Sequence, residues 1–170
     1  AFNLYMPHIF RDEAKAFFNK YLQRIRELKF DNFIVRSLEE IFYIDDNIDN
    51  NANIILDYSV YAYNKNTIGF YNDNFNIKRL TYPLELNLSE IRQLDNPGNE
   101  MIAYGKIPMM VSAQCLKKTT KGCDHKKEIL VLKDRKNSEM QVKTHCDFCY
   151  NTILNSKPLS VLGMEKEVKK

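Results

Sequence analysis

Four cysteines arranged in two pairs constrain the carboxy-terminal part of this chain. Cys115 and Cys123 stand in "SAQCLKKTTKGC", and Cys146 and Cys149 form the Cys-x-x-Cys of "HCDFCY". Between them, "EILVLKDRKNSEMQVKTH" holds two alternating runs around a polar turn, which predicts a β-hairpin over residues 128–145. A hairpin brings the two pairs together without a long loop. We therefore expect all four thiols to converge on one metal centre.

Composition helps to decide whether the cysteines are metal ligands or form disulfides. A chain of 170 residues, 44% of them hydrophobic, buries a core without needing disulfides. The beginning of the sequence lacks a secretory pattern, and no run approaches about eighteen apolar residues, so we expect a soluble, cytoplasmic protein without membrane contact. In a reducing compartment, clustered cysteines are metal ligands more often than disulfides.

Several alternatives stay open for the cysteines. Four thiolates fit either tetrahedral zinc or an iron–sulfur cluster, and two buried thiols beside an accidental Cys-x-x-Cys would fit no metal at all. His125 and His145 flank the set and are possible replacement ligands, although a neighbouring histidine more often orients a ligand or faces solvent. The net charge of +3 neither requires nor excludes a nucleic-acid partner.

Upstream of the cysteines, short apolar runs alternate with helical or loop segments, as in βα units. Strands are expected in residues 1–6, 30–37, 51–59, 78–86 and 100–105. An amphipathic helix is expected over 12–28 with Asp12 as N-cap, and a short helix over 87–95 with Asn87 and Glu90 as a capping box. The Asn/Asp-rich segment 45–53 lacks the glycine and the terminal glutamate of a calcium loop, so we expect a solvated loop there.

Parallel strands place functional side chains at their carboxyl ends. By that rule, Asp57, Glu85 and Tyr104 are candidate catalytic residues, with the two carboxyls as a proton-transferring pair. Arg11 and Arg36 are candidates for binding a substrate carboxylate. The structural alternative is that Asp57 caps the next segment and Glu85 makes an ion pair.

Three segments carry a resemblance to a known family. "EMIAYGKIPMMVSAQC", the following "KDR" and "CDFCYNTILNSKPLSVLG" closely resemble the carboxy-terminal part of the collagenase-like peptidases, the peptidase U32 family. "ILDYSVYAYN" and "RLTYPLELNLSEI" look like the family's penultimate barrel strands. The resemblance covers nearly everything from about residue 50 and, more loosely, the beginning.

The resemblance implies a fold and a function. Family members resemble a TIM-type barrel with a small appended region, and many hold a 4Fe-4S cluster on four cysteines. Here this implies an α/β fold with a partial TIM-type barrel over 1–105 and a cysteine-rich, metal-binding hairpin region over 106–170. Iron–sulfur-dependent hydroxylation of ribosomal or transfer RNA bases, with prephenate as co-substrate, is the first interpretation. A collagenase-like peptidase and a noncatalytic zinc-stabilised module are the alternatives.

One departure from the family pattern bears on activity. A complete barrel takes about 250 residues, whereas this chain supplies some five strands before its cysteines. We therefore expect either a fragment that lacks the amino-terminal half of the barrel, which we favour, or a naturally short member that completes its sheet by pairing with another chain. In both cases the open sheet edges should associate, and the chain alone should be inactive. A classical peptidase mechanism has no visible parts, because the chain contains neither Gly-x-Ser-x-Gly nor His-Glu-x-x-His.

Overall fold

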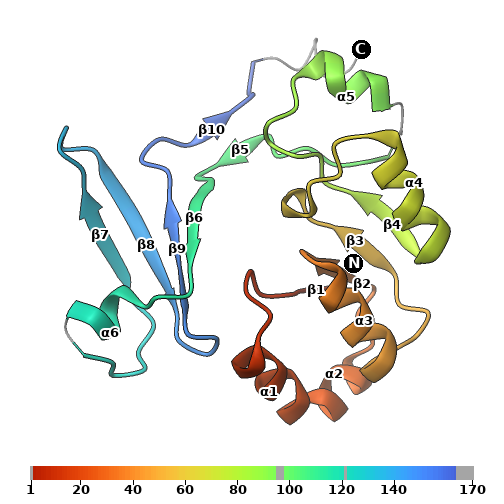
Figure 1. Ribbon diagram of the computed structural model, residues 1–170, viewed down its shortest axis with the longest axis horizontal. Helices are drawn as coiled ribbons and strands as arrows, with labels where there is room; N and C mark the ends of the chain where they lie inside the picture. The colour runs from red at the N-terminus through yellow and green to blue at the C-terminus, as the bar shows by residue number, and fades with distance from the viewer. Residues whose placement is uncertain (1, 95–97, 121, 164–170) are drawn as a thin grey trace. The chain divides into compact units, whose positions relative to one another are not determined.

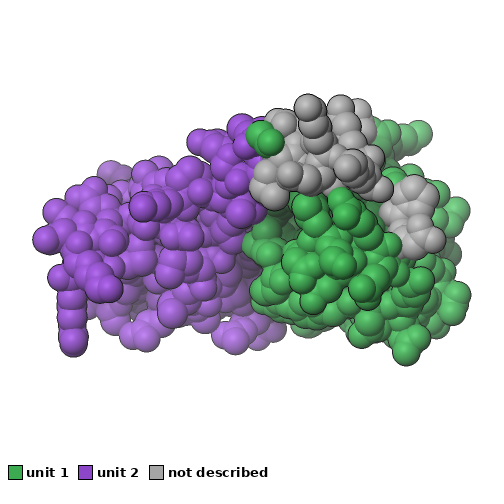
Figure 2. Space-filling model, turned by 90° about the horizontal axis from the view of Figure 1, so that it is seen from above, with its two compact units in different colours: residues 1–6, 21–102, 163–170 green, residues 7–20, 103–162 purple. Residues whose placement is uncertain are grey.

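The computed structural model describes residues 2–94, 98–120 and 122–163. The chain divides into two compact units, coloured separately in Figure 2. The sheet unit comprises residues 1–6, 21–102 and 163–170, and the cysteine unit comprises 7–20 and 103–162. Compared with the expected division after residue 105, the structure assigns the segment 7–20 to the same unit as the cysteines.

A four-stranded parallel sheet forms the framework of the sheet unit (Figure 1). Its order is β1 (Asn3–Tyr5), β2 (Asn32–Val35), β3 (Ile54–Leu56) and β4 (Ile77–Leu80). The connections contain α2 (Leu22–Leu28), α3 (Leu38–Asn47), the 3-10 turn η1 (Tyr58–Val60) and α4 (Lys65–Asn74). Every residue of β3 is buried, as expected for a central parallel strand. The prediction of an α/β fold built on parallel βα units is confirmed.

The prediction of five barrel strands is wrong in its last member. The described residues form an open four-stranded sheet, not a closed barrel, and Glu100 adds only a single parallel bridge to Thr81. Beyond Ile102 the chain enters the cysteine unit, where β5 (Tyr104–Gly105) pairs antiparallel with β10 (Leu159–Ser160). The segment 100–105 is therefore not one strand: its first residue bridges to Thr81, and its last two form β5.

Helix boundaries differ from the sequence prediction at two places. The helix expected over 12–28 is divided into α1 (Asp12–Lys20) and α2, because Tyr21 leaves the helical backbone at φ −106° and ψ 11°. Asp12 lies in the first turn of α1 rather than at its N-cap. The expected loop 45–53 begins inside α3, whose N-cap Ser37 accepts a hydrogen bond from Glu40 N at 3.3 Å.

The short helix after β4 agrees with its predicted cap. In α5 (Leu88–Leu94), Asn87 N donates to Glu90 Oε2 at 2.8 Å and Glu90 N donates to Asn87 Oδ1 at 3.1 Å. These two bonds are the reciprocal pair of a capping box, which satisfies donors that the first helical turn leaves unpaired.

An antiparallel sheet organises the cysteine unit (Figure 1). Its order is β6 (Pro108–Ser112), β9 (Tyr150–Leu154), β8 (Glu139–His145) and β7 (Ile129–Lys133), with α6 (Leu116–Thr120) between β6 and β7. The β7–β8 hairpin confirms the one predicted over 128–145. Val142 and Tyr150 of the sheet and Phe18 of α1 are among the buried residues of this unit. No helix in the described parts of the chain is long and apolar enough to cross a membrane.

Candidate functional site

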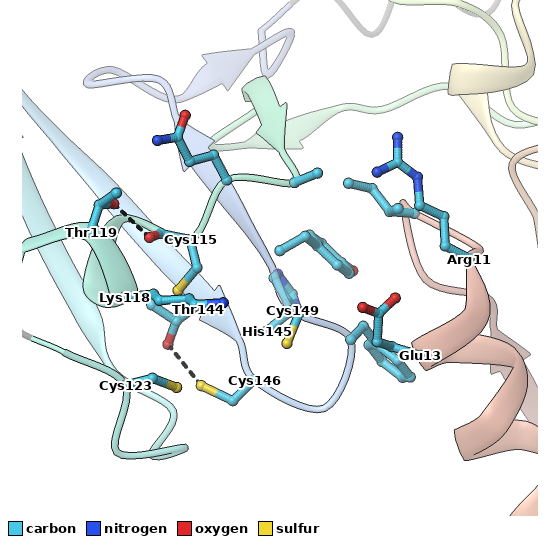
Figure 3. Close-up of a pocket in the computed structure, with 15 residues that line it drawn as sticks. Arg11, Glu13, Cys115, Lys118, Thr119, Cys123, Thr144, His145, Cys146 and Cys149 are labelled. Atoms are coloured by element: carbon cyan, nitrogen blue, oxygen red, sulfur yellow. Dashed lines mark hydrogen bonds between the residues drawn. The ribbon is translucent and has the colours of Figure 1, made fainter.

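All four cysteines line one cavity of the cysteine unit, with a volume of about 550 Å³, which we name the thiol cavity. Cys115 precedes α6, Cys123 follows it, and Cys146 and Cys149 lie between β8 and β9. None of the four forms a disulfide. Their sulfur atoms face a shared space in Figure 3. The structure thus places both pairs on the wall of one cavity.

The Cys-x-x-Cys motif forms the tight turn that joins β8 to β9. Phe148 N donates to His145 O at 3.1 Å, and Cys149 adopts the left-handed conformation with φ 53°. That region is uncommon for a residue other than glycine or asparagine, and such residues concentrate at functional sites. The turn places both thiols of the motif on the wall of the thiol cavity.

Hydrogen bonds tie the Cys146 turn to the segment that enters β7. Cys146 Sγ lies 3.3 Å from Lys126 O and 3.8 Å from Thr144 Oγ1. The buried Thr144 hydroxyl accepts from Glu128 N at 2.8 Å and donates to Glu128 O at 3.0 Å. These bonds hold the segment that follows Cys123 against the strand that leads into Cys146.

A buried lysine fixes the loop between α6 and β7. Lys117 is only 4% exposed, and its ammonium contacts the carboxylates of Asp124 and of Glu128, the latter at 3.5 Å, and Lys126 O at 3.1 Å. The hydrogen bond with Asp124 raises the pKa of Lys117 and lowers the pKa of Asp124. This charged anchor positions the loop that contains Cys123.

Aromatic side chains form another wall of the thiol cavity. Tyr150 stacks on His145 with ring centroids 4.3 Å apart, and its hydroxyl accepts a hydrogen bond from His8 N at 3.2 Å. The ring of Phe148 stacks against that of Phe18 at 6.3 Å, which links the Cys-x-x-Cys turn to α1. His145 Nε2 lies 3.1 Å from Thr152 Oγ1, so His145 has a polar partner in β9.

Charged groups also reach the thiol cavity. Arg11, Glu13 and Lys118 line it together with the thiols. Burial raises the pKa of the Cys149 thiol, and Glu13 and the thiols of Cys123 and Cys115 raise it further, whereas Lys118 lowers it.

The donor set suits a soft metal. Thiolates select zinc or iron–sulfur clusters rather than magnesium or calcium. Among the described residues, no three or more His, Cys, Asp or Glu side chains are arranged so that they could hold a metal ion. Four free thiols on one cavity wall fit such a group by chemistry, and their convergence on one metal stays a prediction.

The comparison with known families bears on both units. A model of the family described as Peptidase family U32 matches residues 4–151, which include all four cysteines. The chain belongs to the peptidase U32 family. The expectation drawn from the resemblance is confirmed at the level of family membership. Curated proteins and solved structures gave no match to the chain.

In this peptidase U32 member, two of the candidate site residues pair with each other. In the sheet unit, Arg36 Nε lies 3.3 Å from Asp57 Oδ2, and the Arg36 guanidinium also donates to Met6 O and lies 5.8 Å from the centre of the Tyr5 ring. Asp57 accepts a further hydrogen bond from Ser59 Oγ at 2.8 Å. The two residues follow β2 and β3 directly, at neighbouring carboxyl ends of the sheet.

Glu40 belongs to the same cluster and was missed by sequence reasoning. Its side chain is buried, and Glu40 Oε2 accepts a hydrogen bond from Arg36 N at 2.6 Å. Burial raises the pKa of Glu40 to about 7, although hydrogen bonding and charge from Arg36 oppose the shift. The Ser-x-x-Glu spacing of Ser37 and Glu40 was the available signal, since it marks a helix start.

Neither of the two remaining candidates is among the residues that line the thiol cavity. Glu85 sits in the turn after β4, where its carboxylate is hydrogen-bonded to Tyr63; burial and this bond raise the pKa of Tyr63. Tyr104 lies on β5 of the cysteine unit and is 62% exposed. Of the predicted site residues, the structure groups Arg11 with the four cysteines, and Arg36 with Asp57.

Proposed function

We propose that the thiol cavity holds a 4Fe-4S cluster and that the protein takes part in hydroxylation of RNA bases. The observation that carries the proposal is the gathering of Cys115, Cys123, Cys146 and Cys149, none of them in a disulfide, on the wall of one cavity. Membership of the peptidase U32 family supports it. The resemblance to this family implies such a cluster on four cysteines.

The shape of the site favours a reactive centre over a structural zinc. In structural zinc sites, protein ligands fill all four coordination positions, with thiolates about 2.3 Å from the metal. Here the thiols share about 550 Å³ with Arg11, Glu13 and Lys118. A cluster with open space beside it can contact a substrate, whereas a structural zinc ion does not need such space.

The residues that line the thiol cavity would have separate roles. The four thiolates would hold the cluster, whose chemical contribution is to accept and donate single electrons. Arg11 and Lys118 would bind the carboxylates of an organic acid co-substrate such as prephenate, since guanidinium and ammonium groups form charge-assisted hydrogen bonds with carboxylates. Tyr150 and Phe148 would supply apolar contact for its ring.

The sheet unit would contribute the carboxyl ends of its strands. In this proposal the open parallel sheet is part of a TIM-type barrel that further strands complete, so the chain alone would be inactive. Asp57, Glu85 and Tyr104 remain candidate catalytic residues, and Arg36 a candidate substrate-binding residue.

The test combines metal analysis with RNA chemistry. Protein isolated without oxygen should contain iron and sulfide and show the visible absorption of a cluster. In a deletion strain of the source organism, mass spectrometry should find RNA bases lacking a hydroxyl group that the complete protein restores. Cys146→Ser should lose both iron and hydroxylation, whereas Asp57→Asn and Glu85→Gln should lose hydroxylation and keep iron. Ser112→Ala, outside the cavity wall, is the matched control.

Two outcomes would contradict the proposal. A colourless protein with one zinc per chain and unchanged RNA in the deletion strain would make it a zinc-stabilised module. Hydrolysis of gelatin or peptides that a point variant abolishes would make it a peptidase.

A further inference from the structure

Charge is distributed unequally between the two units. Among the described residues, the cysteine unit contains 13 Lys and Arg residues against 7 Asp and Glu, a formal charge of +6, whereas the sheet unit contains 8 against 12, a charge of −4. The modest net charge of the whole chain, +3, hides this separation. A compact unit with so strong a positive field attracts polyanions.

The carboxylates of the antiparallel sheet region are occupied by internal partners. Asp124 and Glu128 contact the buried Lys117, Glu139 pairs with Lys133 at 3.2 Å, and Asp147 pairs with Lys127. Asp134 is used by the hairpin turn, where its Oδ1 accepts from Lys136 N at 2.7 Å and from Ser138 N at 2.8 Å. Every acidic residue between 103 and 162 is thus engaged within the unit.

Several exposed cations along the hairpin have no carboxylate partner among the described residues, because the nearby carboxylates pair with other groups. Lys126, Arg135, Lys136 and Lys143, which we name the hairpin cations, are exposed, and the described residues include no carboxylate paired with any of them. Arg135 and Lys136 occupy the tip of the β7–β8 hairpin (Figure 1), and Lys143 pairs in register with Ile129 at its other end. The four steps of β7 separate these ends by about 14 Å.

The same surface leads to the thiol cavity. Lys118 is exposed on α6 and lines the cavity. Lys126 O, on the residue that carries one of the hairpin cations, lies 3.3 Å from Cys146 Sγ. A chain of phosphates lying along the hairpin would therefore pass beside the thiols.

We propose that the hairpin cations form the phosphate-binding surface of an RNA substrate and hold it beside the thiol cavity. This inference rests on the proposed function and assigns RNA binding to the cysteine unit rather than to the acidic sheet unit. The contacts are made to phosphates, so they position the RNA and do not read its sequence.

The composition of the surface favours RNA over an acidic protein. Three of the four hairpin cations are lysines, and lysine is depleted at protein–protein interfaces. Nucleic-acid interfaces are far more positive than protein interfaces, and their lysines and arginines contact phosphates.

Salt-dependent binding tests the proposal. Binding of a fluorescently labelled single-stranded RNA to the full chain is measured by anisotropy at several salt concentrations. The variant Arg135→Gln/Lys136→Gln/Lys143→Gln should make the negative slope of log K against log salt less steep by about 2, which corresponds to roughly 100-fold weaker binding at 0.1 M salt. These side chains are exposed, so urea unfolding should match that of the wild type.

The matched control removes the same charge from the sheet unit. Lys29→Gln/Lys65→Gln/Lys78→Gln changes three exposed lysines and should alter RNA affinity less than threefold. An equal loss in both variants, or none in the hairpin variant, would overturn the proposal. Stronger hairpin-dependent binding to phosphatidylserine vesicles or to polyglutamate than to RNA would also overturn it.

The outcome is separable from that of the proposed function. If RNA in the deletion strain is unchanged but hairpin-dependent RNA binding persists, hydroxylation is wrong and the binding surface stands. If hydroxylation occurs in cells with undiminished activity in the hairpin variant, the binding surface is wrong and the function stands.

Discussion

The polar clusters of the two units differ in how their groups are satisfied. In the sheet unit, Arg36, Asp57 and Glu40 are neutralised or hydrogen-bonded by one another and by backbone groups. In the cysteine unit, four thiols line a cavity and form no disulfide. Burial of charge alone therefore does not identify a reactive site, because structural ion-pair networks also bury charges and shift their pKa values.

Removing Arg36 tests the structural role of the first cluster and should have the largest effect on stability. Arg36→Met would leave the buried Asp57 carboxylate without its cation, which should lower the free energy of unfolding by about 3–5 kcal/mol. Urea denaturation measures the loss. As a control, Arg24→Met at the exposed pair with Glu27 should cost about 0–1 kcal/mol. Equal losses would remove the distinction between buried and exposed pairs.

Glu40 predicts how stability changes with pH. Its pKa is about 7 in the folded protein against 4.5 for a glutamate in water, so between these pH values the folded state holds a proton that the unfolded state has released. The free energy of unfolding should therefore fall as the pH rises from about 4.5 to 7, by about 3 kcal/mol in total.

The variant Glu40→Gln isolates this titration. The amide keeps an acceptor for Arg36 N but cannot ionise, so the decline of stability between pH 4.5 and 7 should disappear and the variant should exceed the wild type at pH 8. Urea midpoints across that pH range measure it. Parallel pH curves for the two proteins would show that Glu40 does not titrate there.

Thr144 tests how tightly the cysteine segments are tied together. Thr144→Val retains the shape but deletes the hydroxyl that bonds Glu128 N and Glu128 O, which should cost about 1–3 kcal/mol and speed alkylation of Cys146. Thr119→Val, at an exposed hydroxyl on α6, should change neither quantity appreciably. Unchanged alkylation in Thr144→Val would mean that this bond does not order the thiols.

Tyr150 should give the smallest effect of the series. Tyr150→Phe keeps the ring that stacks on His145 and loses the hydroxyl that accepts from His8 N, which should cost about 0.5–1.5 kcal/mol. Tyr150→Leu, which also removes the stacking, should cost more. If both variants lose the same stability, the ring stacking contributes nothing measurable.

Local patterns predicted the elements that depend on local sequence. The alternation in residues 128–145 predicted β7 and β8, and the Asn87–Glu90 spacing predicted the cap of α5, because neighbouring residues determine both. The predicted hairpin also suggested that the two cysteine pairs lie near each other, and all four cysteines line the thiol cavity; their role as metal ligands stays a prediction.

Tertiary partners decided what the sequence could not predict. Lys117 and Glu40 are charged residues, which sequence patterns assign to the protein surface. Both are buried, and polar partners in the folded structure offset the cost of removing them from water. The apolar periodicity runs unbroken through Tyr21, yet the two halves of that segment belong to different units. The last residues of α3 include Asp45 and Asn47, which are typical of loops, so the sequence predicted a loop from residue 45. The helix extends to Asn47, and its Ile41 and Ile44 are fully buried.

Iron and acid-labile sulfide in protein isolated without oxygen test the central claim most directly. The account predicts about four irons and four sulfides per chain, lost in each of the Cys115→Ser, Cys123→Ser, Cys146→Ser and Cys149→Ser variants and kept in Ser112→Ala. Iron-free protein, or iron that survives substitution in one of the two cysteine pairs, would contradict it.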